Sequence, residues 1–259
     1  MELTIQEIQE LQLEILATLV DVCEKNNISY FIHGGNAIGA IRHGGPIPWD
    51  HDMDILVPES QIDLFCECLQ AKLDSKFYID YHRLDARSKR IFPKITLAAY
   101  ESGIFHVDIF RLIGFPSNLK EQLKIYKKID VLRKILEIKR RYVKTKIYKK
   151  ILFFIPCAVA LIIPTRLLLK AYDKACARYP YGEAEYVGYL GGKHGIRNMF
   201  RRELFDAYTM VDYAGIPVRI VKEYDFYLTQ LYGDYMQLPP EEEQRKAMHK
   251  IYTVKAKKR

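Results

Sequence analysis

Three aspartates at alternate positions, Asp50, Asp52 and Asp54, lie directly before an apolar run, Ile55-Leu56-Val57. Side chains of an extended chain alternate with period two, so these three carboxylates are expected to share one face. Like charges at such spacing destabilise each other unless a cation lies among them, and Mg²⁺ or Mn²⁺ prefers carboxylate oxygens. The spacing therefore indicates metal-assisted chemistry on phosphate. The alternative is an acidic strand end that faces solvent and holds no ion.

A glycine pair, Gly34-Gly35, precedes the acidic segment and follows a short apolar stretch. Glycines let the backbone approach a ligand closely, and the N–H groups at the start of a helix bind anions. We expect a glycine turn, then a short helix that ends near Arg42, whose side chain is a further candidate for a phosphate contact. The pair thus predicts a phosphate cradle upstream of the metal site.

A fourth carboxylate, Asp108, lies in an apolar strand further along the chain. Burying an unpaired carboxylate costs several kcal/mol, so Asp108 needs a partner. A metal ion shared with Asp52 and Asp54 would be one, and a nearby lysine or arginine is the alternative. Lys94 is a candidate for a phosphate contact, or else a surface lysine.

The hydrophobic spacing predicts the elements that must position these residues. A capping box, Thr4 to Glu7, begins an amphipathic helix. The expected elements are a helix from this box to about Lys25, a strand at 29–33, the helix to Arg42, the acidic strand, a helix at 61–73, strands at 77–82, 91–100 and 105–112, and a long basic helix or helix pair at 118–150.

Size and composition indicate a globular protein with a buried core, because 49% of the 259 residues are apolar. The five cysteines are odd in number and scattered, which favours free thiols in a reducing compartment. Cys66 and Cys68 lie in an expected helix without a matching pair elsewhere, so we interpret them as packing residues. The first residues lack the pattern of a signal peptide, which predicts a cytoplasmic protein.

The net charge of +8 belongs to one segment. Residues 120–150 hold 13 Lys/Arg and 3 Asp/Glu, a surplus of 10, so the rest of the chain carries −2. The segment has few interleaved aromatic residues and no recognised module, which argues against nucleic-acid binding.

Fourteen residues without a polar side chain, 151–164, follow the basic segment. As a helix they would span ~21 Å, short of the ~30 Å hydrocarbon core of a bilayer, and Pro156 interrupts them. Residues 120–170 are therefore expected not to cross a membrane but to lie peripherally on its inner face. The alternative is an ordinary core helix.

Two blocks of the chain closely resemble the LicD family of phosphorylcholine transferases, which is related to the fukutin-type ribitol-phosphate transferases. The first block runs from Gly34 through Arg42 and from Ile47 to Ile55, and the second from Ile216 through Tyr232-Gly233-Asp234 to Pro240. They lie in the expected order and almost 180 residues apart, so the resemblance covers most of the chain.

The resemblance implies an α+β protein with a nucleotidyltransferase core of the DNA polymerase β type, a mixed sheet with flanking helices. It assigns residues 1–117 to the catalytic core, 118–180 to a basic and apolar helical insertion, and 181–259 to a part that completes the catalytic domain. It also implies transfer of a phospho-alcohol from a CDP-activated donor to a hydroxyl of a surface glycan or its lipid-linked precursor.

The resemblance further implies that Gly34 and Gly35 bind phosphate and that Asp52, Asp54 and Asp108 hold the metal. Asp108 or Asp50 would accept the proton of the attacking hydroxyl, and Tyr232 and Asp234 would shape a substrate pocket. Asn36 stands where Thr or Ser is more usual, which keeps a polar side chain at the helix start but changes the expected phosphate contacts. His51 replaces a more usual Asp, and alternation would place it opposite the acids.

Two other functions fit parts of the pattern. A nucleotidyltransferase that moves NMP from an NTP to a small molecule shares the glycine pair and the alternating aspartates. A catalytically silent membrane-surface scaffold could use residues 120–170, but it would have no need for three like charges at close range. Pocket and surface shape decide which alcohol is transferred, which glycan accepts it and what the oligomeric state is. These shapes cannot be read from the sequence.

Overall fold

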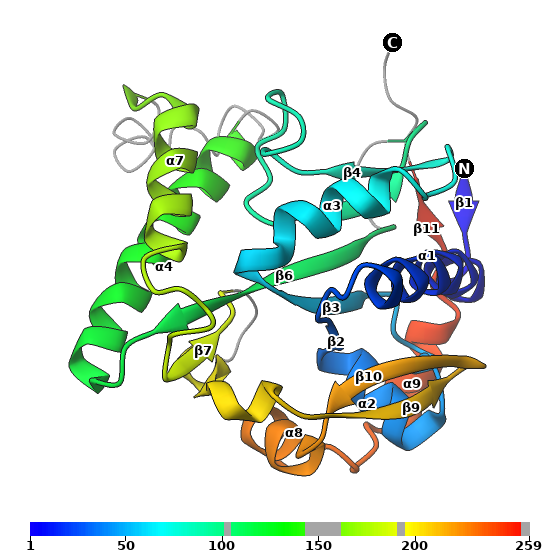
Figure 1. The fold of residues 1–259 in the computed structure, drawn as a ribbon. Coiled ribbons are helices and arrows are strands. Elements are labelled where there is room, and N and C mark those ends of the chain that lie inside the picture. The colour runs from blue at the N-terminus through cyan, green and yellow to red at the C-terminus, as the bar shows by residue number, and fades with distance from the viewer. Residues whose placement is uncertain (101–104, 143–161, 191–194, 255–259) are drawn as a thin grey trace.

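The computed structural model describes residues 1–100, 105–142, 162–190 and 195–254 of the chain (Figure 1). The first helix, α1 (Ile5–Lys25), begins as the sequence predicts. The Thr4 hydroxyl accepts a hydrogen bond from the Glu7 backbone, and the Glu7 carboxylate accepts one from the Thr4 backbone. Asn26 caps its C-terminus.

A seven-stranded mixed sheet forms the centre, which confirms the expected α+β class. Strand β6 (Val107–Phe115) is its spine because it pairs with three neighbours, parallel with β3 (Met53–Pro58) and antiparallel with β5 (Lys94–Leu97) and β7 (Tyr186–Gly188). The outer strands are β2 (Phe31–Ile32), β4 (Phe77–Asp80) and β8 (Met199–Arg201).

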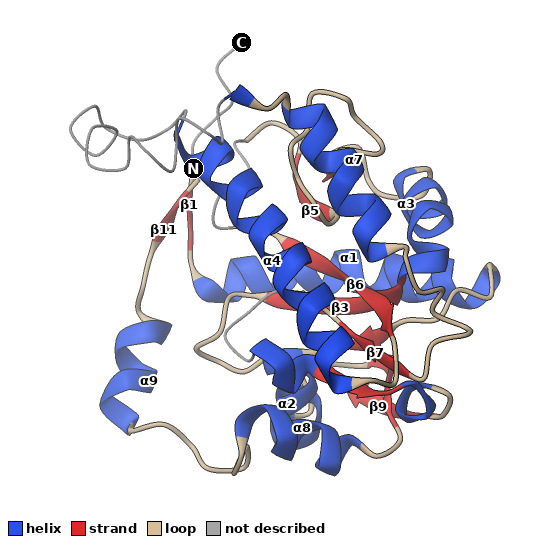
Figure 2. Cartoon of the chain, turned by 90° about the vertical axis from the view of Figure 1, so that its left-hand side faces the viewer, coloured by secondary structure: helices blue, strands red, loops and turns tan. Residues whose placement is uncertain are grey.

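Helices cover the sheet. Helix α1 packs against α3 (Ile62–Gln70) over β3 and β6, and α2 (Gly34–His43) follows β2 (Figure 1). Helices α4 (Leu119–Tyr142) and α7 (Thr165–Cys176) pack against each other beside the end of β6, as Figure 2 shows from the side. The remaining elements are η1 (Glu59–Gln61), η2 (Gly195–Asn198), η3 (Arg202–Phe205), the hairpin β9 (Tyr208–Tyr213) and β10 (Ile216–Val221), α8 (Tyr224–Tyr232), α9 (Glu241–Met248), and the pair β1 (Glu2–Leu3) and β11 (Tyr252–Thr253).

The predicted elements exist, and most are shorter than expected. The helix expected at 61–73 is η1 followed by α3, and the strand expected at 91–100 is the four-residue β5. One expectation is wrong. The acidic segment is extended only from Met53 onward, because residues 48–52 form a turn and irregular chain. Period-two alternation therefore does not apply to Asp50, His51 and Asp52.

The long basic helix is confirmed over the residues of α4. The expectations for the apolar segment, an interfacial helix or a core helix, and for Cys157 fall on residues 143–161, outside the described residues. Within the described part of the chain, no helix combines the length and apolar character that a transmembrane span requires. Cys23, Cys66, Cys68 and Cys176 are free thiols, and all but Cys68 are fully buried, as expected of packing residues.

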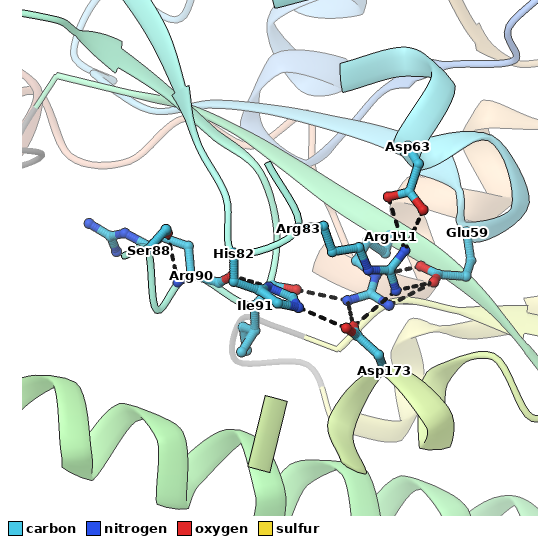
Figure 3. A network of polar contacts seen from close by, with 9 residues as sticks. All are labelled: Glu59, Asp63, His82, Arg83, Ser88, Arg90, Ile91, Arg111 and Asp173. Atoms are coloured by element: carbon cyan, nitrogen blue, oxygen red, sulfur yellow. Dashed lines mark hydrogen bonds and ion pairs between the residues drawn. The ribbon is translucent and has the colours of Figure 1, made fainter. Parts of the chain in front are cut away.

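A charged network anchors α7 to the sheet on the face of β6 that carries Arg111 (Figure 3). The Arg111 guanidinium donates to Glu59 and, over 2.9 Å, to Asp173 on α7. Arg83 donates to the same two carboxylates over 2.8 and 2.9 Å. His82 Nε2 lies 2.7 Å from Asp173.

The network holds its charges because Arg111 pairs with Glu59 and Asp173, and Arg83 pairs with these two and, over 3.1 Å, with Asp63. Burial by itself would raise the pKa of Asp173, but hydrogen bonds from His82 and Arg83 and the charge of Arg111 lower it well below the usual range. Arg111 is buried, with 3% of its side chain exposed, so it depends on these partners.

We expect Glu59→Gln to lower the free energy of unfolding by about 3 kcal/mol, because it removes the charge that Arg111 needs in a buried site. Chemical denaturation measures this change. Glu14→Gln is the matched control, since Glu14 forms a 2.6 Å pair with Lys76 at the surface, where such pairs contribute below about 1 kcal/mol. Equal losses in both variants would contradict the assignment.

Candidate functional site

Three charged residues lie side by side on one face of the sheet. Asp54 of β3 is the register partner of Asp108 of β6, and Asp108 is the register partner of Lys94 of β5. Register partners in adjacent strands point to the same face. Lys94 Nζ lies 2.9 Å from Asp108 Oδ1, and both residues are buried. Lys94 is therefore not a surface lysine, and it is the partner that Asp108 needs.

The loop that carries Asp50 and Asp52 is held by side-chain amides of α1. Gln9 Nε2 donates to the carbonyls of Ile47 and Asp50 over 2.9 and 2.7 Å. The buried Gln12 Nε2 donates to the carbonyl of His51 over 2.8 Å. Through these two glutamines, the first helix fixes the backbone of the acidic loop.

Asn36 holds the same loop from α2. Its Nδ2 donates to the Asp52 carbonyl over 3.2 Å and to the Tyr213 hydroxyl over 3.0 Å. Its Oδ1 accepts the backbone N–H of Asp54 over 2.7 Å. The amide is therefore engaged on both ends, and Asn36 positions the acidic chain rather than reaching toward a phosphate.

His51 lies with the acids and not opposite to them, contrary to the expectation from alternation. Asp50, His51 and Asp52 each offer one ligand atom, and these atoms lie within 4.8 Å of one another. The His51 ring stacks on Tyr252 of β11, with centroids 4.7 Å apart. The chain around His51 is irregular, so the period-two alternation of strands does not predict where its side chain points.

A second histidine, His106, joins the two halves of the site. Its Nε2 lies 3.6 Å from Asp52 Oδ1 and 3.8 Å from Asp108 Oδ2. Sequence reasoning missed it, although its position two residues before Asp108 in an extended segment was a usable indication. His106 links the acidic loop to the row of charges on the sheet.

The glycine pair lies directly against the carboxylates. Gly34, with φ of +60°, occupies the left-handed region, and it belongs to the first turn of α2 rather than to a separate turn. A Cβ at Gly34 would lie 3.3 Å from Asp54 Oδ2 and 3.3 Å from the Tyr232 hydroxyl. At Gly35 it would lie 2.6 Å from Asp50 Oδ2. Only glycine allows this approach of helix start and acids.

Two other predicted residues from the C-terminal block differ in placement. The Tyr232 residue is 37% exposed, but its hydroxyl faces the acids, where loss of solvent and the charges of Asp54 and Asp50 raise the pKa of Tyr232. Asp234 lies in the exposed turn after α8. The structure records no contact between the Asp234 side chain and the other site residues within the described chain.

Arg42 lies at the far end of α2 from Gly34. Its Nη1 donates to the carbonyls of Tyr235 and Gln237 over 2.8 and 3.2 Å. These bonds hold the segment after α8 against α2. The predicted phosphate contact would require the guanidinium to leave both carbonyls, so we do not include Arg42 in the proposed site.

The buried His33, which directly precedes α2, contacts the backbone of Asp54 in the row of charges. The His33 ring hydrogen-bonds to the Tyr227 hydroxyl of α8 through Nδ1 and packs edge-on against Tyr189. Its backbone N–H donates to the Asp54 carbonyl over 3.0 Å. Sequence reasoning did not single out His33, because the partners of its ring, Tyr189 and Tyr227, lie more than 150 residues away.

The carboxylates of the site repel one another. Burial, and then the charges of Asp108, Asp52 and Asp50, raise the pKa of Asp54 well above its usual range. Burial also raises the pKa of Asp50. The ligand atoms of Asp50, His51 and Asp52 lie within 4.8 Å of one another, and Asp54 and Asp108 are neighbouring carboxylates on the sheet. Such carboxylate oxygens suit a divalent cation such as Mg²⁺ or Mn²⁺. The residues present therefore fit the metal that the sequence implies.

Comparison with known proteins identifies the region that contains this site. Residues 27–145 match the family model described as "LicD/FKTN/FKRP, nucleotidyltransferase domain". Over 94% of its length the chain is 28% identical to "Lipopolysaccharide cholinephosphotransferase LicD" of Haemophilus influenzae, of which it covers 96%. Residues 27–145 thus carry a LicD-type domain, and the chain resembles LicD along nearly its whole length.

The chain also shares a short block with an animal protein. It is 46% identical over 37 residues to "Ribitol 5-phosphate transferase FKRP" of Homo sapiens, which is 14% of this chain and 8% of that protein. The resemblance expected from the two sequence blocks is therefore confirmed, including the link to the fukutin-related proteins.

We expect Asn36→Ala to lower the free energy of unfolding by about 3 kcal/mol, because it removes the three hydrogen bonds that Asn36 makes with Asp52, Asp54 and Tyr213. Tyr213→Phe removes only the hydroxyl partner of Asn36 and should cost about 1 kcal/mol. Denaturant titration of both variants checks this. A larger loss for Tyr213→Phe than for Asn36→Ala would contradict the clamp.

Asp54→Asn should raise the melting temperature of the metal-free protein at pH 8 by roughly 2–4 °C, the shift that corresponds to about 1 kcal/mol. The raised pKa of Asp54 means that its charged form is disfavoured in the folded state. The wild type therefore gains stability as pH falls through that pKa, and the advantage of the variant should vanish near pH 4.

Thermal melts in a chelator at several pH values test this prediction. Asp21→Asn, at an exposed pair on α1, is the control and should show no such pH-dependent gain. A variant less stable than the wild type at every pH would show that repulsion among the acids is not the dominant effect.

Proposed function

We propose that this protein transfers a phospho-alcohol, such as phosphocholine, from a CDP-activated donor to a hydroxyl of a cell-surface glycan or its lipid-linked precursor. The supporting observation is the row of Asp54 and Asp108 beside the start of α2, in a chain similar along nearly its whole length to a cholinephosphotransferase. The expected polymerase β-type fold is supported by the nucleotidyltransferase name of the matched family.

In the proposed reaction the acceptor oxygen attacks the phosphorus that bears the alcohol. The bond from this phosphorus to the bridging oxygen breaks, and CMP leaves with the electron pair. Asp52, Asp54 and Asp108, with Asp50 and His51 beside them, would hold Mg²⁺ or Mn²⁺, which when bound neutralises charge on the donor diphosphate. The proton of the attacking hydroxyl passes to a carboxylate.

Asp108 and Asp50 are the two candidates to accept that proton. Burial raises the pKa of Asp50, which makes its carboxylate a better proton acceptor near neutral pH. Asp108 already has Lys94 at 2.9 Å. Lys94 and the N–H groups at the start of α2, from Gly34 and Gly35, would stabilise the phosphates on the two sides of the carboxylates.

We expect Asp52→Ala and Asp54→Ala each to lower the transfer rate by about two to three orders of magnitude while the protein stays folded. The assay incubates the protein and Mg²⁺ or Mn²⁺ with CDP-choline, CDP-ethanolamine, CDP-glycerol, CDP-ribitol, CTP and ATP, and follows release of CMP or pyrophosphate. Asp21→Ala, an exposed change on α1, is the control.

Two outcomes would overturn the proposal. Turnover like that of the wild type in either variant would remove these acids from the mechanism. Consumption of CTP or ATP with release of pyrophosphate, and none of the CDP-alcohols, would favour the nucleotidyltransferase alternative that shares this site layout.

A further inference from the structure

A cavity of about 240 Å³ adjoins the acidic site at Asp108. Asp108 and Phe110 of β6 line one side, and they share a face of the strand because they are two residues apart. The other side is one face of α4, formed by Arg133, Leu136 and Arg140. Asp108 therefore belongs both to the row of charges and to this cavity.

The lining is basic. Lys89, Arg90, Arg133 and Arg140 face two acids, Asp108 and Glu137. Each arginine forms an ion pair with an acid nearby in the chain: Arg90 with Asp80 over 3.2 Å, Arg133 with Asp130 over 2.7 Å, and Arg140 with Glu137 over 3.6 Å. A guanidinium carries five N–H donors in a planar fork that fits a phosphate or carboxylate.

The cavity also offers apolar surface for a ring. Phe92 and Phe110 pack with centroids 5.0 Å apart, and both line it. Its volume lies below the roughly 300 Å³ from which pockets for drug-sized ligands begin, so it suits one small cyclic unit. Basic groups and aromatic surface in one cavity match a saccharide that carries an anionic group.

The position of the cavity favours the acceptor over the donor. The start of α2, where the donor diphosphate is proposed to bind, lies against Asp54 and Asp50. The cavity is lined by Asp108, the middle member of the row, and not by Asp54 or Asp50. In phosphoryl transfer the attacking and leaving oxygens lie roughly in line on opposite sides of phosphorus. An acceptor should therefore enter from the side opposite to the donor.

We propose that this cavity is the acceptor subsite and that it selects a saccharide unit bearing a phosphate or carboxylate group. Arg133 and Arg140 bind the anionic group, and the accepting hydroxyl turns toward Asp108. This inference rests on the proposed function for the word acceptor. The preference for an anionic sugar is a property of the cavity itself and can be measured without the donor.

The test is binding of a hexose 6-phosphate, the same hexose without phosphate, a hexuronate and inorganic phosphate to the full chain, by calorimetry. Arg133→Gln and Arg140→Gln should each weaken binding of the sugar phosphate about ten-fold and leave the weaker binding of the neutral hexose unchanged. Melting temperatures of both variants show that they are folded.

Matched controls come from a second basic hollow near the start of α4, lined by Lys124, Lys128 and Arg178 and without contact to the acids. Lys128→Gln and Arg178→Gln should leave binding of the sugar phosphate within two-fold of the wild type. If these changes weaken it as much as Arg133→Gln and Arg140→Gln do, the effect is one of overall charge and the proposal fails.

Three further results would overturn the proposal. One is unchanged affinity in both folded cavity variants. Another is inorganic phosphate that binds as tightly as the hexose 6-phosphate, since the site would then recognise only an anion. The third is binding of anionic phospholipid vesicles, lost in Arg133→Gln and Arg140→Gln, without binding of any sugar.

Asp52→Ala separates this proposal from the proposed function. Asp52 does not line the cavity, so the variant should lose transfer and still bind the sugar phosphate like the wild type. Sugar-phosphate binding without any turnover of CDP-alcohols would reject the proposed function alone. Turnover of CDP-alcohols without selective binding in the cavity would reject only the subsite.

Discussion

The structure depends on keeping like charges together at the edge of the core. Asp108 is buried, Asp50 and Asp54 are partly buried, and the side chain of Asp52 is half exposed. Asp54 and Asp108 are register partners on adjacent parallel strands, and Asp50 and Asp52 lie beside them. Such an arrangement opposes folding because each carboxylate raises the cost of the next. Lys94 offsets part of this cost at 2.9 Å from Asp108, and the start of α2 presents backbone N–H groups near Asp54 and Asp50. The remaining charge suits a divalent cation.

Elements from both ends of the chain hold this arrangement. Gln9 and Gln12 of α1 fix the backbone of the acidic loop, and Asn36 of α2 binds the Asp52 carbonyl and the Asp54 N–H. The terminal strands β1 and β11 pair, which brings Tyr252 onto His51. Side-chain amides can hold a loop of acids where charged side chains would neutralise it, and this is the physical reason for amides at these positions.

Strand β6 connects the site with the helical part of the molecule through its two faces. Asp108 and Phe110 point to the site and the basic cavity, whereas Arg111 points to the network with Glu59 and Asp173. That network fixes α7, which packs on α4, the helix that carries Arg133 and Arg140. The wall of the cavity therefore depends on buried ion pairs on the opposite face of the same strand.

The sequence by itself determined the elements and the acids. Patterns among neighbouring residues can be read from the sequence alone. They include the capping box of Thr4 and Glu7, the glycine pair, the apolar strand around Asp108 and the motifs that carry the family resemblance. Tertiary structure alone decided what those residues touch. His51 joined the acids because the chain is irregular before Met53, Lys94 became the partner of Asp108 through strand register, and His106 came within reach of Asp52 through packing. Such contacts depend on distances between segments far apart in the chain, and periodicity carries no information about them.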